Sequence, residues 1–195
     1  MAWHANLAAA ACLASAAMAS EPVPISPAHS TIRTLALASA EPKKSPCSTG
    51  KFREFDFWVG TWEVTDGGSG RRAGMNDITL EQNGCVVIER WHSASGATGL
   101  SMNHYDPHAD KWRQHWVGLD LVLEMAGGMK EGSMVLEGPL QYLATGEVTL
   151  LRGIWTPLPN GRLRHRFLES KDHGKTWADW FDGYYTRMQT PNPPE

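Results

Sequence analysis

The sequence contains 195 residues with a formal net charge of -3, and 42% of its residues are hydrophobic. A chain of this length can form one domain with a sizeable core. Its charges are mixed, with no basic stripe or acidic tail, so neither a nucleic acid nor an anionic membrane surface is expected as a partner. Tryptophan is unusually frequent, with nine copies, and this predicts a core or pocket lined with aromatic rings.

Residues 1–19 contain a short apolar run followed by Ala17-Met18-Ala19, a small-residue pattern that signal peptidase cleaves. We interpret this segment as a signal peptide, because the run is too short and too rich in alanine to span a bilayer. An ordinary N-terminal tail is the alternative, since no Lys or Arg precedes the run. Export predicts a periplasmic or secreted protein. Residues 20–50 are rich in Pro, Ser and Ala and are expected to form a disordered linker.

Removal of the signal peptide leaves two cysteines, Cys47 and Cys85. In an oxidising compartment an even pair favours a disulfide, which would stabilise the fold by roughly 3 kcal/mol through loop closure. Two free buried thiols are the alternative. Neither cysteine lies in a C-x-x-C motif or beside clustered histidines, so no metal site is predicted.

Most of the chain from residue 51 to residue 188 alternates with a period of two, which is typical of antiparallel strands. About ten strands are predicted, at residues 57–66, 73–81, 84–92, 98–105, 111–118, 121–126, 132–137, 147–156, 162–169 and 177–188. Turn-forming residues separate many of them: Asp66-Gly67-Gly68, Asn83-Gly84, Asp106-Pro107, Gly127-Gly128, Asn160-Gly161 and His173-Gly174. A short helical turn is expected at residues 51–57, and residues 189–195 form a proline-rich tail that is expected to be disordered.

A ten-stranded meander has two open edges, and pairing its first strand with its last removes both of them. The predicted fold class is therefore all-β, an antiparallel meander closed into a β-barrel over residues 51–188. At this strand number the interior is somewhat wider than side chains alone can fill, which leaves space for a ligand.

The first predicted strand contains the stretch FDFWVGTWEV, in which Trp58 and Trp62 flank Gly60. Glycine permits a sharp bend and a close approach of neighbouring groups, and Trp62, extended by Trp58, can plug one end of the barrel. Gly60-Thr61-Trp62, together with Arg187 near the end of the last strand, resembles the lipocalin or calycin signature. That resemblance implies that the arginine of the final strand closes over the tryptophan.

Five ordered blocks resemble a family of exported bacterial lipocalin-like proteins of unknown function: FDFWVGTWEV, GCVVIERW, KWRQHWVG, GIWTP and SKDHGKTW. The resemblance covers roughly residues 52–188. It implies a barrel with an internal cavity, and no assigned activity comes with it.

The alternation also predicts which side chains face the interior. In RLRHRFLE, burying three unpaired guanidinium groups would be too costly, so the arginines at 162, 164 and 166 should face water, with His165 and Phe167 inside. In KWRQHWVG the aromatic face is the expected interior, with Trp112, Gln114 and Trp116. In GCVVIERWH the pattern leaves two options open, because Glu89 can lie in the cavity beside Trp91 or outside in a charge ladder.

Together these side chains predict a mostly apolar pocket with a few orienting polar groups, which is typical of a small-molecule site. The predicted site residues are Glu89, Trp91, Trp112, Gln114, Trp116, His165 and Phe167. The main hypothesis is a carrier or sensor that binds a small hydrophobic or aromatic molecule. The alternative is a cofactor-independent isomerase, cyclase or hydratase that uses Glu89 and His165 as an acid/base pair. A structural or partner-binding envelope protein is the third hypothesis, if side chains fill the barrel.

No cofactor is predicted. Haem is an alternative, because His104, His115 and His165 are candidate axial ligands. The segment SKDHGKTW matches the Asp-box of sialidase propellers, but one copy cannot build a propeller. It is therefore predicted to be the tight turn between the last two strands.

Overall fold

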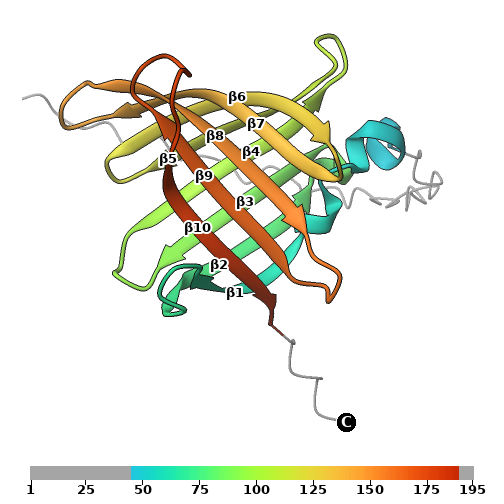
Figure 1. Cartoon of the computed structure of the whole chain (residues 1–195). Helices are drawn as coiled ribbons and strands as arrows, with labels where there is room; N and C mark the ends of the chain where they lie inside the picture. Colours follow the sequence, from blue (N-terminus) through green and yellow to red (C-terminus); the bar gives the residue numbers. More distant parts are fainter. Residues whose placement is uncertain (1–44, 189–195) are drawn as a thin grey trace, which may run out of the picture. The chain divides into compact units, whose positions relative to one another are not determined.

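The computed structural model describes residues 45–188. They form ten strands, which pair antiparallel in the closed order β1-β10-β9-β8-β7-β6-β5-β4-β3-β2 (Figure 1). The barrel has a mean radius of 10 Å. Its strands are β1 (Gly60–Asp66), β2 (Arg72–Glu81), β3 (Val86–Ser93), β4 (Thr98–Asp106), β5 (Lys111–Gly118), β6 (Leu121–Lys130), β7 (Ser133–Tyr142), β8 (Val148–Pro157), β9 (Leu163–Ser170) and β10 (Ala178–Arg187).

The predicted fold class is confirmed, because an all-β, ten-stranded antiparallel meander closes into a barrel. Closure is made by β1 and β10, which pair from Trp62 opposite Arg187 to Asp66 opposite Gly183. Neither terminal strand therefore presents an open edge to another chain.

Several predicted segments fall outside the described residues. These are the signal peptide (1–19), most of the linker (20–50) and the C-terminal tail (189–195). Residues 45–50, at the end of the expected linker, are described and contain the short 3₁₀ helix η1 (Pro46–Ser48). Within the described part of the chain, no helix has the length and apolar character needed to cross a membrane.

The predicted turn at Gly127-Gly128 is wrong. Both glycines lie inside β6, and the chain turns instead at Glu131 and Gly132, which have positive φ angles of 49° and 80°. A Cβ at Gly127 would lie 2.0 Å from the carbonyl oxygen of Val135 on β7. Gly127 is therefore needed for the close approach of two strands, and β6 and β7 both extend beyond their predicted limits.

The first strand begins at Gly60, later than predicted, because the residues before it form the 3₁₀ helices η2 (Gly50–Arg53) and η3 (Asp56–Trp58). Phe55 and Trp58 are fully buried, and their rings stack with centroids 4.8 Å apart. Both rings also contact Trp155 of β8, at centroid distances of 5.3 and 5.6 Å. The plug at this end of the barrel therefore comes largely from the segment that precedes β1.

Arg187 closes over Trp62, as the resemblance to lipocalins implies. Its guanidinium carbon lies 4.2 Å from the centroid of the Trp62 ring, and its Nη1 donates a hydrogen bond to the carbonyl oxygen of Val59 at 2.8 Å. The Trp62 indole in turn donates to the carbonyl oxygen of Trp58 at 2.9 Å. Gly60 makes this arrangement possible, because its φ is +141° and a Cβ there would lie 2.3 Å from Arg187 Nη1.

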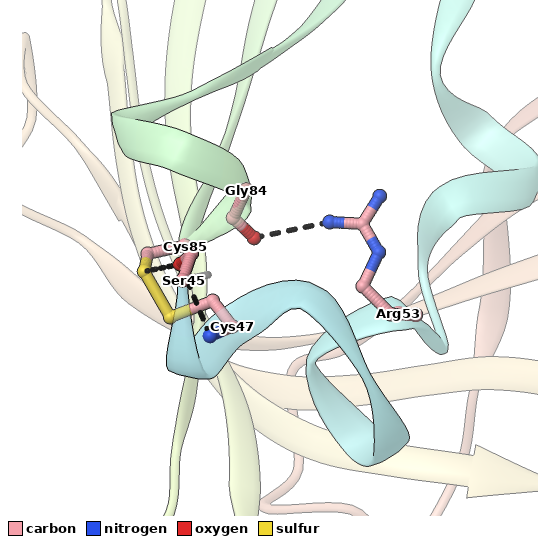
Figure 2. The surroundings of a disulfide bond; sticks show 5 residues. All are labelled: Ser45, Cys47, Arg53, Gly84 and Cys85. Atoms are coloured by element: carbon pink, nitrogen blue, oxygen red, sulfur yellow. Dashed lines mark hydrogen bonds between the residues drawn. A yellow bond between two sulfur atoms is a disulfide. The ribbon is translucent and has the colours of Figure 1, made fainter. Parts of the chain in front are cut away.

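The predicted disulfide is present and joins Cys47 in η1 to Cys85 in the β2–β3 turn (Figure 2). Arg53 of η2 donates to the carbonyl oxygen of Gly84, beside Cys85, at 3.2 Å. Figure 2 shows that the bridge and this hydrogen bond link the two helices to the same turn. The N-terminal segment is therefore held on the barrel by a covalent and a polar contact.

We expect Gly60→Ala to lower the free energy of unfolding by about 1–3 kcal/mol, because alanine is strained at φ +141° and would displace Arg187. Urea unfolding followed by tryptophan fluorescence measures the loss. The matched control is Gly128→Ala, where a Cβ would meet nothing within 4 Å, so its stability should change by less than about 0.5 kcal/mol. Equal effects of the two substitutions would contradict this account.

Replacing both cysteines by serine should lower the free energy of unfolding by roughly 3–4 kcal/mol, because the bridge closes a loop with a sequence separation of 38. Urea titrations of the oxidised wild type and the double variant give the difference. A reducing agent should destabilise the wild type and leave the double variant unchanged. A wild type that is insensitive to the reducing agent would show that the bridge does not form.

Candidate functional site

The turns of the barrel alternate between its two ends. The N-terminal segment is tied to one end, since Cys47 is bonded to Cys85 in the β2–β3 turn and Lys51 forms an ion pair with Asp110 in the β4–β5 turn. A cavity of about 440 Å³ lies toward the other end, with lining residues in or beside the β1–β2, β3–β4, β5–β6 and β9–β10 turns. This volume is within the range of small-molecule sites, roughly 300–1,000 Å³.

Aromatic rings line the cavity, and glycines leave room for two of them against the wall. The aromatic lining includes Trp91, Trp116, Phe167, Trp180 and Phe181. A Cβ at Gly99 or Gly118 would lie 2.0 or 2.1 Å from the ring of Trp116, and a Cβ at Gly74 would lie 2.6 Å from the ring of Trp91. These rings therefore lie against bare backbone of β2, β4 and β5, which leaves space in the middle of the barrel.

A chain of buried polar side chains begins at the inner part of the cavity. The hydroxyl of Tyr185 lies 3.2 Å from His165 Nδ1 and accepts a hydrogen bond from Asn76 Nδ2, also at 3.2 Å. Asn76 Nδ2 donates to Glu89 Oε1 at 2.7 Å, and Ser101 Oγ donates to Glu89 Oε2 at 2.7 Å. His165, Tyr185 and Glu89 line the cavity, whereas Asn76 and Ser101 are fully buried.

The chain continues along the wall to β5. Asn103 Nδ2 donates to Ser101 Oγ at 2.8 Å and to the carbonyl oxygen of Val87 at 3.0 Å. Gln114 Nε2 donates to Asn103 Oδ1 at 2.8 Å. Hydrogen bonds thus connect interior groups from β9 round to β5, and such a network holds its members in one arrangement because the surrounding dielectric is low.

Burial dominates the protonation of this network. It lowers the pKa of His165 to about 3, so the imidazole is neutral near pH 7. Burial also raises the pKa of Glu89, and the hydrogen bonds from Asn76 and Ser101 offset part of that rise. The pKa of Tyr185 is raised by burial and then by the nearby Glu89. Burial therefore favours the neutral form of each of the three groups, and for Glu89 a positive charge placed beside it would favour the carboxylate instead.

Five of the predicted site residues line the cavity: Glu89, Trp91, Trp116, His165 and Phe167. Glu89, whose orientation the alternation leaves open, points inward and is 5% exposed. Gln114 belongs to the buried network without lining the cavity. Trp112 lies at the plugged end, where its indole donates to the carbonyl oxygen of Lys51 at 3.1 Å and its ring contacts Phe55.

Asn76, Ser101, Asn103 and Tyr185 are not among the site residues predicted from the sequence. The alternation along β4 carries a signal for two of them, since Ser101 and Asn103 are fully buried on either side of Met102, which is 44% exposed. Asn76 and Tyr185 also lie at alternately buried positions of β2 and β10, but their role in the site depends on hydrogen bonds to residues of other strands.

Trp180 and Phe181 also line the cavity, although they are adjacent in sequence. The register between β9 and β10 shifts between Asp179 and Phe181, which leaves Trp180 without a paired residue. Such a bulge re-aims side chains and breaks the period of two. The alternation therefore cannot identify this pair as lining residues.

The arginines at 162, 164 and 166 face outward as expected, and those at 164 and 166 are paired with acidic groups. Arg164 forms two hydrogen bonds to Asp182, at 2.9 and 2.7 Å, and Arg166 donates to Asp179 at 2.6 Å. The guanidinium of Arg162 lies over the ring of Tyr184, 5.4 Å from its centroid.

The Asp-box segment forms the turn between β9 and β10, as predicted. Asp172 accepts hydrogen bonds from the backbone N–H and the hydroxyl of Thr176 and from the hydroxyl of Ser170. These bonds lower the pKa of Asp172 to about 2. The polar residues of this motif therefore hold the turn together by hydrogen bonds within it.

The three histidines that are candidate axial ligands of a haem do not lie together. His165 lines the cavity, whereas His115 is exposed on the outer face beside Glu124. His104 is paired with Arg113 at an outward position of β4. Over residues 45–188, no group of three or more His, Cys, Asp or Glu side chains is placed to hold a metal ion.

No protein-family model and no curated protein sequence matches this chain. The class that fold and site define is a closed, ten-stranded antiparallel barrel with an aromatic-lined cavity at one end.

Replacing His165 by phenylalanine should change how stability depends on pH. The unfolded chain binds a proton on this histidine below about pH 6.5, and the folded protein resists protonation until about pH 3. The stability that neutral His165 contributes is therefore present above pH 6.5 and is lost as the pH falls. Between pH 6.5 and pH 5, the variant should gain about 2 kcal/mol relative to the wild type.

Urea unfolding of both proteins at several pH values measures this difference. Trp116→Phe is the control, because it alters the same cavity without removing a titratable group, and its difference from the wild type should stay nearly constant. A His165→Phe difference that does not vary with pH would contradict the burial of a neutral imidazole.

Proposed function

We propose that this protein is an exported, lipocalin-like barrel that binds a small hydrophobic or aromatic molecule in the cavity at its open end, as a carrier or sensor. The observation that carries the proposal is the cavity of about 440 Å³ with its aromatic lining and buried polar floor. An apolar site with a few fixed polar groups is the usual design of a small-molecule pocket.

The closure of the barrel supports a lipocalin-like assignment. Arg187 covers Trp62 at the end opposite the cavity. It lies next to Gly60, where any residue with a Cβ would collide with the guanidinium. The disulfide between Cys47 and Cys85 supports a periplasmic or secreted location, because such bridges persist in oxidising compartments.

Binding is favoured over the alternative of an isomerase, cyclase or hydratase. An acid/base pair needs both groups within reach of one substrate, and Glu89 is hydrogen-bonded to Asn76 and Ser101, with no direct contact to His165. Glu89 and His165 are connected only through Asn76 and Tyr185. A carboxyl group held in this way is suited to orienting a bound polar group.

Titration with N-phenyl-1-naphthylamine, a neutral apolar fluorophore, tests the proposal. The wild type should bind one equivalent with an increase in probe emission. Ala73 lines the cavity, so Ala73→Phe should weaken binding at least about tenfold by occupying the space of the ligand. Ala178→Phe adds the same ring at an exposed position of β10 and should bind as the wild type does. Absence of binding, or binding that Ala73→Phe leaves unchanged, would refute the proposal.

A further inference from the structure

The charged residues that line the cavity are all acidic. They are Asp66, Glu89 and Asp120, and no Lys or Arg of the described residues is among the lining. Asp66 lies at the end of β1 and Asp120 in the β5–β6 turn, so both are near the mouth, while Glu89 is deep in the interior. A cavity that is lined by negative charges and has low-dielectric walls concentrates cations.

Glu89 has no cationic partner among residues 45–188, since each of their salt bridges involves other acidic groups. A buried carboxyl is usually paired with a cation or a metal. The groups that donate hydrogen bonds to Glu89, from Asn76 and Ser101, carry no charge. The neighbouring His165 is neutral near pH 7 and so supplies no counter-charge.

Glu89 can accept more hydrogen bonds than it receives. Its two carboxyl oxygens accept one hydrogen bond each, from Asn76 and Ser101, whereas an ionised carboxylate has about four lone-pair positions. A protonated amine carries hydrogen-bond donors and a positive charge but no acceptor. It would therefore supply both the donors and the counter-charge that Glu89 lacks, which a carbonyl or a carboxylate cannot do.

The walls fit such a ligand as well. Trp91, Trp116 and Trp180 line the cavity with indole rings, and the faces of tryptophan attract organic cations more strongly than those of other side chains. The same rings bury the apolar body of the ligand.

From the carboxyl groups, the free acceptor positions of Glu89 and the indole lining, we infer that the ligand of the cavity is an organic cation, a hydrophobic or aromatic amine whose ammonium group binds to Glu89. This inference rests on the proposed function, because it names the class of ligand for the same cavity.

Three probes with one ring system and different charges test it: 2-(1-naphthyl)ethylamine, 2-(1-naphthyl)ethanol and 1-naphthylacetate, which are cationic, neutral and anionic at pH 7. Isothermal titration calorimetry gives their dissociation constants. The amine should bind at least about tenfold more tightly than the alcohol, and the carboxylate should bind most weakly. Glu89→Gln should remove the preference for the amine and retain binding of the alcohol.

The matched control is Glu63→Gln, which removes an exposed carboxyl of β1 that is paired with Arg72 on the outside, and it should keep the preference. Asp120→Asn should also keep most of it, since Asp120 is near the mouth. A preference that survives Glu89→Gln, or an amine that binds no better than the alcohol, would overturn the inference and leave the proposed function standing. Failure of all three probes to bind would overturn both.

A structure of the wild type with the amine provides a test that does not depend on the folding of a variant. The amine nitrogen should lie within hydrogen-bond distance of the Glu89 carboxyl. A nitrogen placed at the mouth beside Asp66 or Asp120 would overturn the assignment to Glu89.

Discussion

The contact between Arg187 and Trp62 joins the last strand of the barrel to the first, and the interior depends on it. The guanidinium covers the indole while it is bonded to the backbone before Gly60, so one residue links β10, β1 and the N-terminal plug. A closed barrel has no edge that can pair with another chain. It also encloses a volume from which water is largely removed, and this is why the polar groups inside it must bond to one another.

Aromatic residues serve two different purposes at the two ends. At the plugged end, the fully buried rings of Phe55, Trp58 and Trp155 pack against one another. Toward the open end, the ring of Trp116 lies against Gly99 and Gly118 and so lines the wall without crossing the interior. The same residue type therefore closes one end and shapes a cavity at the other, according to whether its neighbour is another ring or a glycine.

The buried network gives the cavity its chemical character. Desolvation favours the neutral forms of His165, Tyr185 and Glu89, yet Glu89 receives only one hydrogen bond on each carboxyl oxygen. A fully satisfied network would contribute only rigidity, whereas an acidic group with free acceptor positions can orient a ligand that brings donors. The polar groups are a small part of the cavity surface, but they determine which kind of ligand the cavity can orient.

The sequence by itself determined that about ten antiparallel strands close into a barrel, because the period of two and the turn residues are local signals. The cysteine count favoured the disulfide, and the contact of Arg187 with Trp62 was implied by the resemblance to lipocalins. The cost of burying the arginines at 162, 164 and 166 placed His165 and Phe167 inside, and the aromatic face of β5 placed Trp116 there. Only the tertiary structure decided that Gly127 brings two strands together, that Trp112 belongs to the plug, and that Trp180, beside a bulge, lines part of the cavity. Asn76 and Tyr185 join the site through bonds between strands that lie far apart in the chain, and contacts of that kind have no period to reveal them.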